Sequence, residues 1–175
     1  MDDVRYPLGR FQPPRNVTAE LRDTWVEQFA QAPAKLRAAV DGLDADQLQT
    51  TYREGGWTVA QVVHHLCDSH MNAYIRFKLA LTEEVPTVKG YDESAWATLP
   101  DASSTAGLDV SLRLLEALHE RALAMLRAMG PDAWGRQYVH EEAGLRTLDL
   151  TLAIYAWHGR HHVAHITKLR ERMGW

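Results

Sequence analysis

The sequence predicts an all-α fold, a bundle of four helices that forms a single domain over residues 1–175. Two observations support this prediction. Four stretches of about twenty residues repeat apolar side chains at every third or fourth position, which is the spacing of an amphipathic helix, and no stretch shows the clear alternation of a strand. With 175 residues, of which 46% are apolar, the chain can bury one substantial core.

The first helix is expected over residues 18–40. A proline-rich arm at residues 6–16 precedes it and predicts an irregular but ordered backbone. Pro33 falls inside the helical pattern and should kink or split the helix, because proline lacks the backbone N–H that a helix interior requires. A short helical turn is expected over residues 44–48.

The second helix is expected over residues 58–83. It begins at Thr58, which forms the pattern of a capping box with Gln61 three residues later. The connection that follows, residues 84–107, contains prolines, a glycine and a serine-rich patch. So long a connection without regular structure is uncommon inside a domain, and it therefore indicates a crossover or a functional loop.

The third and fourth helices are expected over residues 108–129 and 147–173. Leucines at helical spacing mark the third helix, which ends at the Gly130-Pro131 pair. Residues 131–146 predict a turn followed by a loop or a hairpin. The fourth helix carries basic residues near its carboxyl end, where they suit the helix dipole, and it ends at Gly174.

The composition excludes several classes of function. The formal net charge is −4 and no long basic stripe occurs, so nucleic acid is not an expected partner. Cys67 is the single cysteine, cannot form an internal disulfide and is expected to be an inert packed thiol. The first residues lack the features of a signal peptide, and no apolar run is long enough to span a membrane. The expected location is therefore the cytoplasm.

Four of the nine histidines lie in the last predicted helix: His158, His161, His162 and His165. All but His161 share the face that also carries Ile154 and Leu169, and this face should point into the bundle. Buried imidazoles are costly unless their nitrogens are satisfied, and two histidines four residues apart can bind one metal ion. The pattern therefore predicts a metal site. Of the two competing pairs, His158 with His162 lies nearer the centre of the face than His161 with His165.

A third ligand is expected from the second helix, which offers three candidates: His64, His65 and His70. The apolar face of that helix contains His70 at its centre and leaves His65 at its margin. His65 instead begins a polar stripe with four other residues: Gln61, Asp68, Asn72 and Arg76. Such a stripe is usually a solvated surface but equally suits the wall of a wet cavity, so periodicity leaves the choice between His65 and His70 open.

Three segments carry a family resemblance that covers nearly the whole chain: GGWTVAQVVHHLCDSHMNAYIRFKLALTEE, YDESAW and WHGRHHVAHITKLRERMGW. They resemble the DinB/YfiT-like metalloenzymes, and within these the subgroup of bacillithiol transferases and metal-dependent hydrolases. The resemblance implies an up-down-up-down four-helix bundle, one zinc or nickel ion per chain and a homodimer. It also implies the ligands, His65 from the second helix and the pair His158 and His162 from the fourth. His165 stands where many relatives have glutamine and is expected to support a ligand.

The up-down-up-down order would make the second and fourth helices parallel and would place the three ligands near the loops at residues 42–57 and 130–147. Five side chains are then expected to form the rim of a substrate pocket: Tyr52, Arg53, Trp57, Tyr138 and His140. Three side chains of the polar stripe are further candidates for positioning a thiol or a substrate: Asp68, Asn72 and Arg76.

Three neutral imidazoles leave one position open on a four-coordinate ion, which is the arrangement of a catalytic site. Together with this open position, the family resemblance implies transfer of a low-molecular-weight thiol of the bacillithiol type to an electrophilic substrate. Hydrolysis by metal-activated water at the same site is the alternative, because a thiolate and a hydroxide suit the same position. A non-catalytic metal-binding module of a stress response is a second alternative.

Overall fold

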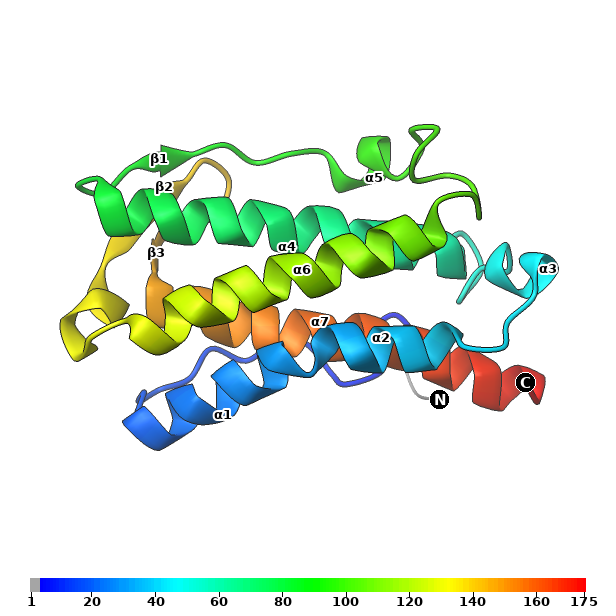
Figure 1. Cartoon of the computed structure of the whole chain (residues 1–175), viewed down its shortest axis with the longest axis horizontal. Helices are drawn as coiled ribbons and strands as arrows, with labels where there is room; N and C mark the ends of the chain where they lie inside the picture. The colour runs from blue at the N-terminus through cyan, green and yellow to red at the C-terminus, as the bar shows by residue number, and fades with distance from the viewer. Residues whose placement is uncertain (1–3) are drawn as a thin grey trace.

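The computed structural model describes residues 4–175 and contains the four long helices that the sequence predicts (Figure 1). The helices are α1 (Ala19–Ala30) continued by α2 (Ala32–Val40), α4 (Val59–Thr82), α6 (Leu108–Ala128) and α7 (Leu148–Met173). Within the described residues, every helix is too short or too polar to cross a membrane. The expected all-α four-helix bundle is therefore confirmed.

Pro33 divides the first helix, as expected. Gln31 ends α1 and also begins α2, and Pro33 lies in the first turn of α2. The N–H groups of the first turn have no partner within the helix, so a proline there costs the helix no hydrogen bond. The two segments continue side by side with α7, so that the division bends the first helix without removing it from the bundle (Figure 1).

Polar side chains cap the starts of α3 (Ala45–Leu48), α4 and α7. The Thr58 hydroxyl accepts from the backbone N–H of Gln61, and the Gln61 side chain accepts from the backbone N–H of Thr58. Thr147 caps the start of α7, which ends at Gly174 with a φ of 74°, a left-handed conformation that favours glycine. The short α3 also begins with a capping box.

The directions of the helices differ from the expected up-down-up-down order (Figure 1). His64 lies 2.8 Å from Ser111, and His70, further along α4, lies 2.8 Å from His119, further along α6. Thus α4 and α6 run parallel. The first half of α4 packs against the last turns of α7, and the second half of α4 packs against the first turns of α7. Because α4 and α7 are therefore antiparallel, the order is up-down-down-up.

The connection between α4 and α6 explains this order. It runs back along the length of the bundle through β1 (Thr87–Val88) and α5 (Glu93–Trp96) before α6 begins (Figure 1). The Gln61 side chain donates to the carbonyl of Ala97 at 2.8 Å, which attaches the connection to the first turn of α4. The expected crossover is confirmed, and it returns the chain to the end of the bundle at which α4 began.

A small three-stranded sheet closes the other end of the bundle. After the 3₁₀ turn η1 (Pro131–Gly135), strands β2 (Gln137–His140) and β3 (Gly144–Thr147) form an antiparallel hairpin. β1 of the crossover pairs in parallel with β2, so the order in the sheet is β1-β2-β3. The hairpin was one of the two forms expected for this segment. A sheet was not expected, because strands of two to four residues are too short for a periodic pattern.

The core consists of two apolar clusters with histidines between them. The cluster near the sheet includes Phe77 and Leu152, and the cluster at the opposite end includes Leu36, Leu66 and Ile166. Along α4, α6 and α7 alike, buried histidines separate the residues of one cluster from those of the other. We define the histidine layer as four buried histidines, His65, His70, His119 and His162, together with the partly buried His158. The layer places polar chemistry at mid-height in an otherwise apolar interior.

Leu36→Ala should test the packing of α2 against the core. The Leu36 side chain is fully buried, so its truncation removes apolar contacts and leaves a cavity, and we expect the free energy of unfolding to fall by about 2–5 kcal/mol. Leu114→Ala is the matched control, because Leu114 is 46% exposed on α6 and its truncation should change the free energy by less than about 0.5 kcal/mol. Urea denaturation followed by circular dichroism measures both. Equal losses in the two variants would contradict this placement of α2.

Candidate metal centre

Three histidines from two antiparallel helices converge in the histidine layer. His65 comes from α4, and His158 and His162 lie one turn apart on α7. Each offers a ring nitrogen, and the three nitrogens lie within 4.8 Å of one another. The Nε2 atoms of His65 and His158 are 3.3 Å apart. These are the three residues that the family resemblance implied as ligands, and we refer to them as the histidine triad.

The triad is uncharged near neutral pH. Burial lowers the pKa of His65 to about 4. Burial and the neighbouring imidazoles lower the pKa values of His158 and His162 well below the usual range. A neutral imidazole has one nitrogen with a free lone pair, which is the form that binds zinc or nickel. Two such nitrogens held 3.3 Å apart inside the bundle suit a shared ion, and the donor set therefore fits a divalent metal.

His165 and the carbonyl of Arg5 orient the ring of His162. The Nε2 of His165 lies 3.1 Å from the Arg5 carbonyl, and its Nδ1 lies 3.3 Å from the Nδ1 of His162. A carbonyl only accepts, so the proton of His165 is on Nε2 and its Nδ1 accepts from the Nδ1–H of His162. The Nε2 of His162 is then left with its lone pair. Support of this kind is the role that the resemblance implied for His165.

The other candidate histidines have different partners. His64 bonds to the hydroxyl of Ser111 and to the carbonyl of Ser104. His161 stacks on Trp157 with ring centroids 4.3 Å apart. Within the described residues, neither joins a group of three ligands. The pair His161 with His165 thus has no partner from α4.

His70, the alternative that periodicity left open, lies deeper in the bundle. It is 1% exposed, and its Nδ1 lies 2.8 Å from the Nε2 of His119 on α6. The structure therefore brings His65 rather than His70 into the triad. Cys67, also on α4, is buried, and this burial raises the pKa of its thiol to about 12. The raised pKa agrees with the expectation of an inert packed side chain.

A cavity of about 410 Å³ opens over His65 and His162 of the triad, and three of the expected rim residues line it: Tyr52, Arg53 and Trp57. The ring of Trp57 lies 4.5 Å from that of His65 and 6.2 Å from that of His162. The Nε of Arg53 donates to the hydroxyl of Tyr52, and its Nη1 donates to a backbone carbonyl. A guanidinium and two aromatic rings therefore surround the approach to the triad.

The comparisons with known proteins agree on one family. A model of the DinB superfamily matches residues 28–166, which is most of the chain. The chain belongs to the DinB superfamily. Proteins from Bacillus cereus (strain ATCC 10987) and from Bacillus thuringiensis subsp. konkukian are each 51% identical over the full length of both chains. Each carries the name "Putative metal-dependent hydrolase".

A solved structure extends the agreement to the fold. The chain superposes on YfiT from Bacillus subtilis with a TM-score of 0.95 and 48% identity, over 99% of each chain. YfiT is described as "a probable metal-dependent hydrolase with an unusual four-helix bundle topology". The up-down-down-up order of this DinB-superfamily chain is likewise a departure from the simple alternating bundle.

Tyr138 and His140 are corrections to the expected rim. Both belong to the hairpin β2–β3, and the antiparallel course of α4 and α7 puts this hairpin at the end of the bundle away from residues 42–57 (Figure 1). Tyr138 is 2% exposed, and its hydroxyl lies 3.0 Å from that of Thr151 in the core. The expectation failed because it assumed that the two ligand-bearing helices are parallel.

Beyond His65, the polar stripe of α4 also lies outside the cavity over the triad. Arg76 is 9% exposed, donates to the hydroxyl of Tyr155 and reaches the carbonyl of Lys89. Asn72 donates to the carbonyl of Asp68 and lines a separate cavity beside the crossover. Burial raises the pKa of Asp68. The crossover covers this stripe, so Asp68, Asn72 and Arg76 do not line the cavity over the triad as positioning residues for a substrate should.

Two groups of residues in the site were not expected from the sequence. Arg5 and Tyr6 come from the arm before α1, and Glu93 and Ser94 come from α5. Glu93 and Ser94 lie within YDESAW, one of the segments that carry the family resemblance, whereas Arg5 and Tyr6 lie before these segments. No helical periodicity marks either group. They reach the site only because the arm and the crossover fold back along the bundle (Figure 1).

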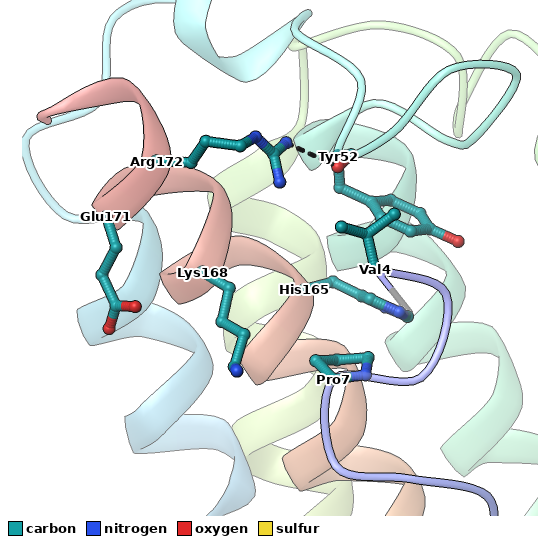
Figure 2. Close-up of a pocket in the computed structure, with 7 residues that line it drawn as sticks. All are labelled: Val4, Pro7, Tyr52, His165, Lys168, Glu171 and Arg172. Atoms are coloured by element: carbon teal, nitrogen blue, oxygen red, sulfur yellow. Dashed lines mark hydrogen bonds between the residues drawn. The ribbon is translucent and has the colours of Figure 1, made fainter. Parts of the chain in front are cut away.

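A second cavity of about 360 Å³ adjoins the first (Figure 2). Tyr52 and His165 line both cavities, and the arm contributes Val4 and Pro7 to the second. Arg172 donates to the backbone carbonyl of Tyr52 at 2.8 Å on one side of it (Figure 2). A ligand larger than the first cavity therefore has a partly apolar space to enter beside His165.

The metal-free protein should lose stability as the pH falls from 6.5 towards 4. His119 is buried and uncharged, with a pKa lowered to about 4 by burial, whereas in the unfolded chain it binds a proton near pH 6.5. Its stabilising contribution is complete above pH 6.5 and is lost at about 1.4 kcal/mol per pH unit below that value.

Urea denaturation in the presence of a chelator, at pH about 7.5 and about 5, measures this loss. His119→Gln should show a shallower dependence than the wild type, because one of the titrating groups is absent. His64→Gln provides a control at another buried histidine of the bundle. A wild-type stability that is unchanged across the window would contradict the uncharged state of the histidine layer.

Proposed function

We propose that this protein is a metal-dependent enzyme that activates a low-molecular-weight thiol of the bacillithiol type for transfer to an electrophilic substrate. The observation that carries the proposal is the convergence of His65, His158 and His162, two of which, His65 and His162, line an open cavity. Within the described residues no fourth histidine, cysteine or carboxylate joins the three. Three protein ligands with one open position are typical of catalytic zinc sites.

A bound zinc or nickel ion would supply the Lewis acidity that lowers the pKa of a thiol or of water. The residues around the triad supply the rest. The Arg53 side chain, directed by its bonds to Tyr52 and to a backbone carbonyl, offers its remaining N–H groups to an anionic part of the thiol. Trp57 covers the rings of His65 and His162 and limits the access of water. In the transfer, the thiol loses its proton, its sulfur bonds to the electrophilic carbon, and the leaving group departs with its bonding electrons.

Hydrolysis at the same site is the second candidate, and the names of the full-length relatives favour it. The arrangement that accepts a thiol also accepts water, because both present one small donor atom that loses a proton on activation. In this reaction Arg53 would bind the substrate rather than the thiol. A non-catalytic role is less well supported, because a structural metal site is normally closed by a fourth protein ligand.

Other features of the proposal rest on the sequence: the family resemblance implies the metal ion and the homodimer, and the length and composition favour the single domain and the cytoplasmic location. We propose a single domain over residues 1–175, one metal ion per chain, a homodimer and a cytoplasmic location. Zinc and nickel remain equal candidates for the ion, because both bind neutral imidazole.

Metal content should depend on the triad. We expect about one zinc or nickel ion per chain in untagged wild-type protein, and a loss of most of it in His158→Gln, because two remaining imidazoles bind weakly. His140→Gln is the control, because His140 lies on β2 away from the triad. Elemental mass spectrometry on both variants measures the content. A wild-type protein that stays metal-free after incubation with zinc and nickel would refute the proposed site.

The two reactions can be separated with one enzyme preparation. Zinc-loaded protein with bacillithiol and chlorodinitrobenzene should form the thioether and release chloride at least about tenfold faster than His158→Gln does. Nitrophenyl acetate without thiol reports hydrolysis by the same preparation. Thioether formation measured by mass spectrometry supports transfer, whereas ester hydrolysis without any thiol-dependent reaction would favour the second candidate.

A further inference from the structure

Behind His158, on the side away from the cavity, lies a second pair of histidines that the proposed reaction does not use. His70 on α4 and His119 on α6 are 1% and 2% exposed. The ring centroid of His70 lies 5.7 Å from that of His158. The pair therefore occupies the histidine layer directly beside a proposed ligand.

The hydrogen bonds of this pair have a single direction. The Nδ1 of His119 lies 3.0 Å from the carbonyl of Phe29, which only accepts, so His119 carries its proton on Nδ1. The Nε2 of His119 is then an acceptor, and the Nδ1–H of His70 donates to it at 2.8 Å. Burial lowers the pKa of both rings, so each carries only one proton. The Nε2 of His70 is thus left as a lone pair that faces the interior.

The buried ring nitrogens without a hydrogen-bond partner within the described residues include Nε2 of His70 and Nδ1 of His158; the others are Nδ1 of His161 and Nε1 of Trp157. Those of His70 and His158 belong to neighbouring rings, and an unpaired polar atom in such a place is costly. The Nε2 of His70 is an acceptor, so the Nδ1 of His158 must carry a proton for the two to satisfy each other. They can do so directly after a small ring rotation, or through one water molecule.

We propose that His70 and His119 are positioning residues that hold His158 in the tautomer with its proton on Nδ1. The Nε2 of His158, which faces His65, then keeps the lone pair that a metal ion needs. The hydrogen-bond chain behind His158 runs through the rings of His70 and His119 to the Phe29 carbonyl. Because this carbonyl only accepts, it sets the direction of every bond in the chain. This chain matches the shorter one in which the Arg5 carbonyl and His165 set the tautomer of His162.

The packing around the pair limits other arrangements. The ring of Phe29 stacks on that of His119 with centroids 4.0 Å apart. A Cβ at Gly159, next to His158, would lie 3.0 Å from the Cβ of Ala32 and 3.7 Å from the Cε1 of His70. The glycine thus lets α7 approach α2 while the His70 ring remains beside it. Rings confined in this way keep the orientation on which the hydrogen-bond chain depends.

The inference rests on the proposed metal site for its purpose, but its first test needs no metal. In metal-free protein labelled with ¹⁵N at histidine, NMR correlation of ring nitrogens with ring protons distinguishes the two tautomers. We expect the Nδ1–H form for His158 in the wild type. In His119→Leu, His70 loses the acceptor that fixes its own tautomer, so His158 should become a mixture of both forms. An Nε2–H form of His158 in the wild type would overturn the inference.

The second test is zinc affinity, measured by competition with a chromophoric chelator. We expect His119→Leu to bind zinc about 10–100-fold more weakly than the wild type. His119→Gln should recover part of the loss, because its amide oxygen can accept from His70. His64→Leu is the matched control. It removes another buried, doubly hydrogen-bonded imidazole on α4, whose partners are Ser111 and Ser104 rather than a ring of the triad, so it should lower stability without lowering affinity.

The outcomes separate the two proposals. If the wild type binds no zinc, the proposed function fails, while the NMR result still supports or overturns the tautomer assignment. If the wild type binds zinc and His119→Leu binds it equally well, the positioning role is overturned and the metal site stands. Circular dichroism of His119→Leu, compared with His64→Leu, shows whether a loss of affinity exceeds the effect of lower stability.

Discussion

The structure depends on the need to satisfy a layer of uncharged imidazoles in the middle of an apolar bundle. Each ring has one donor and one acceptor, and an unpaired nitrogen there would cost about 1–3 kcal/mol. The protein meets this need by hydrogen bonds between the rings. Each series of these bonds ends at a backbone carbonyl, that of Phe29 or that of Arg5. These bonds are directional, so they constrain the height of α6 relative to α4 and α1. The apolar clusters on either side stabilise the bundle but are far less selective about register.

Helix direction decides which segments reach the triad. Because the crossover returns the chain before α6 begins, α4 and α7 are antiparallel, and the loop before α4 meets the second half of α7 (Figure 1). Tyr52 and Trp57 of that loop therefore cover the triad, while the hairpin closes the distant end. The same course of the crossover carries α5 to the cavity and covers the polar stripe of α4. One long connection thus accounts both for the residues that line the site and for those that do not.

The helices and the triad could be predicted from the sequence, whereas the direction of the helices and much of the cavity wall could not. Periodicity and caps are local, so Pro33, Thr58 and Gly174 mark helix ends without any knowledge of the fold. Periodicity also shows which face of a helix is buried, but a face has no direction, and the pattern of α4 is the same whether α7 runs parallel or antiparallel to it. Arg76 illustrates a further limit: it belongs to a polar stripe, yet the crossover buries it. The choice of His65 over His70 came from the resemblance, because both histidines prove to be buried and only their distant partners distinguish them.

The two histidines of α7 in the triad are supported from opposite sides by elements of unequal stability. The chain behind His158 ends at Phe29, a buried residue of α1 whose ring is stacked in the core. The hydrogen bonds behind His162 end at Arg5, an exposed residue of an arm that has no helix or strand. Local opening of such a segment costs far less free energy than opening of the core. The arm also lines both cavities through Val4, Arg5 and Tyr6. A ligand that orders the arm would therefore also order the support of His162, while the geometry at His158 is set by the bundle itself.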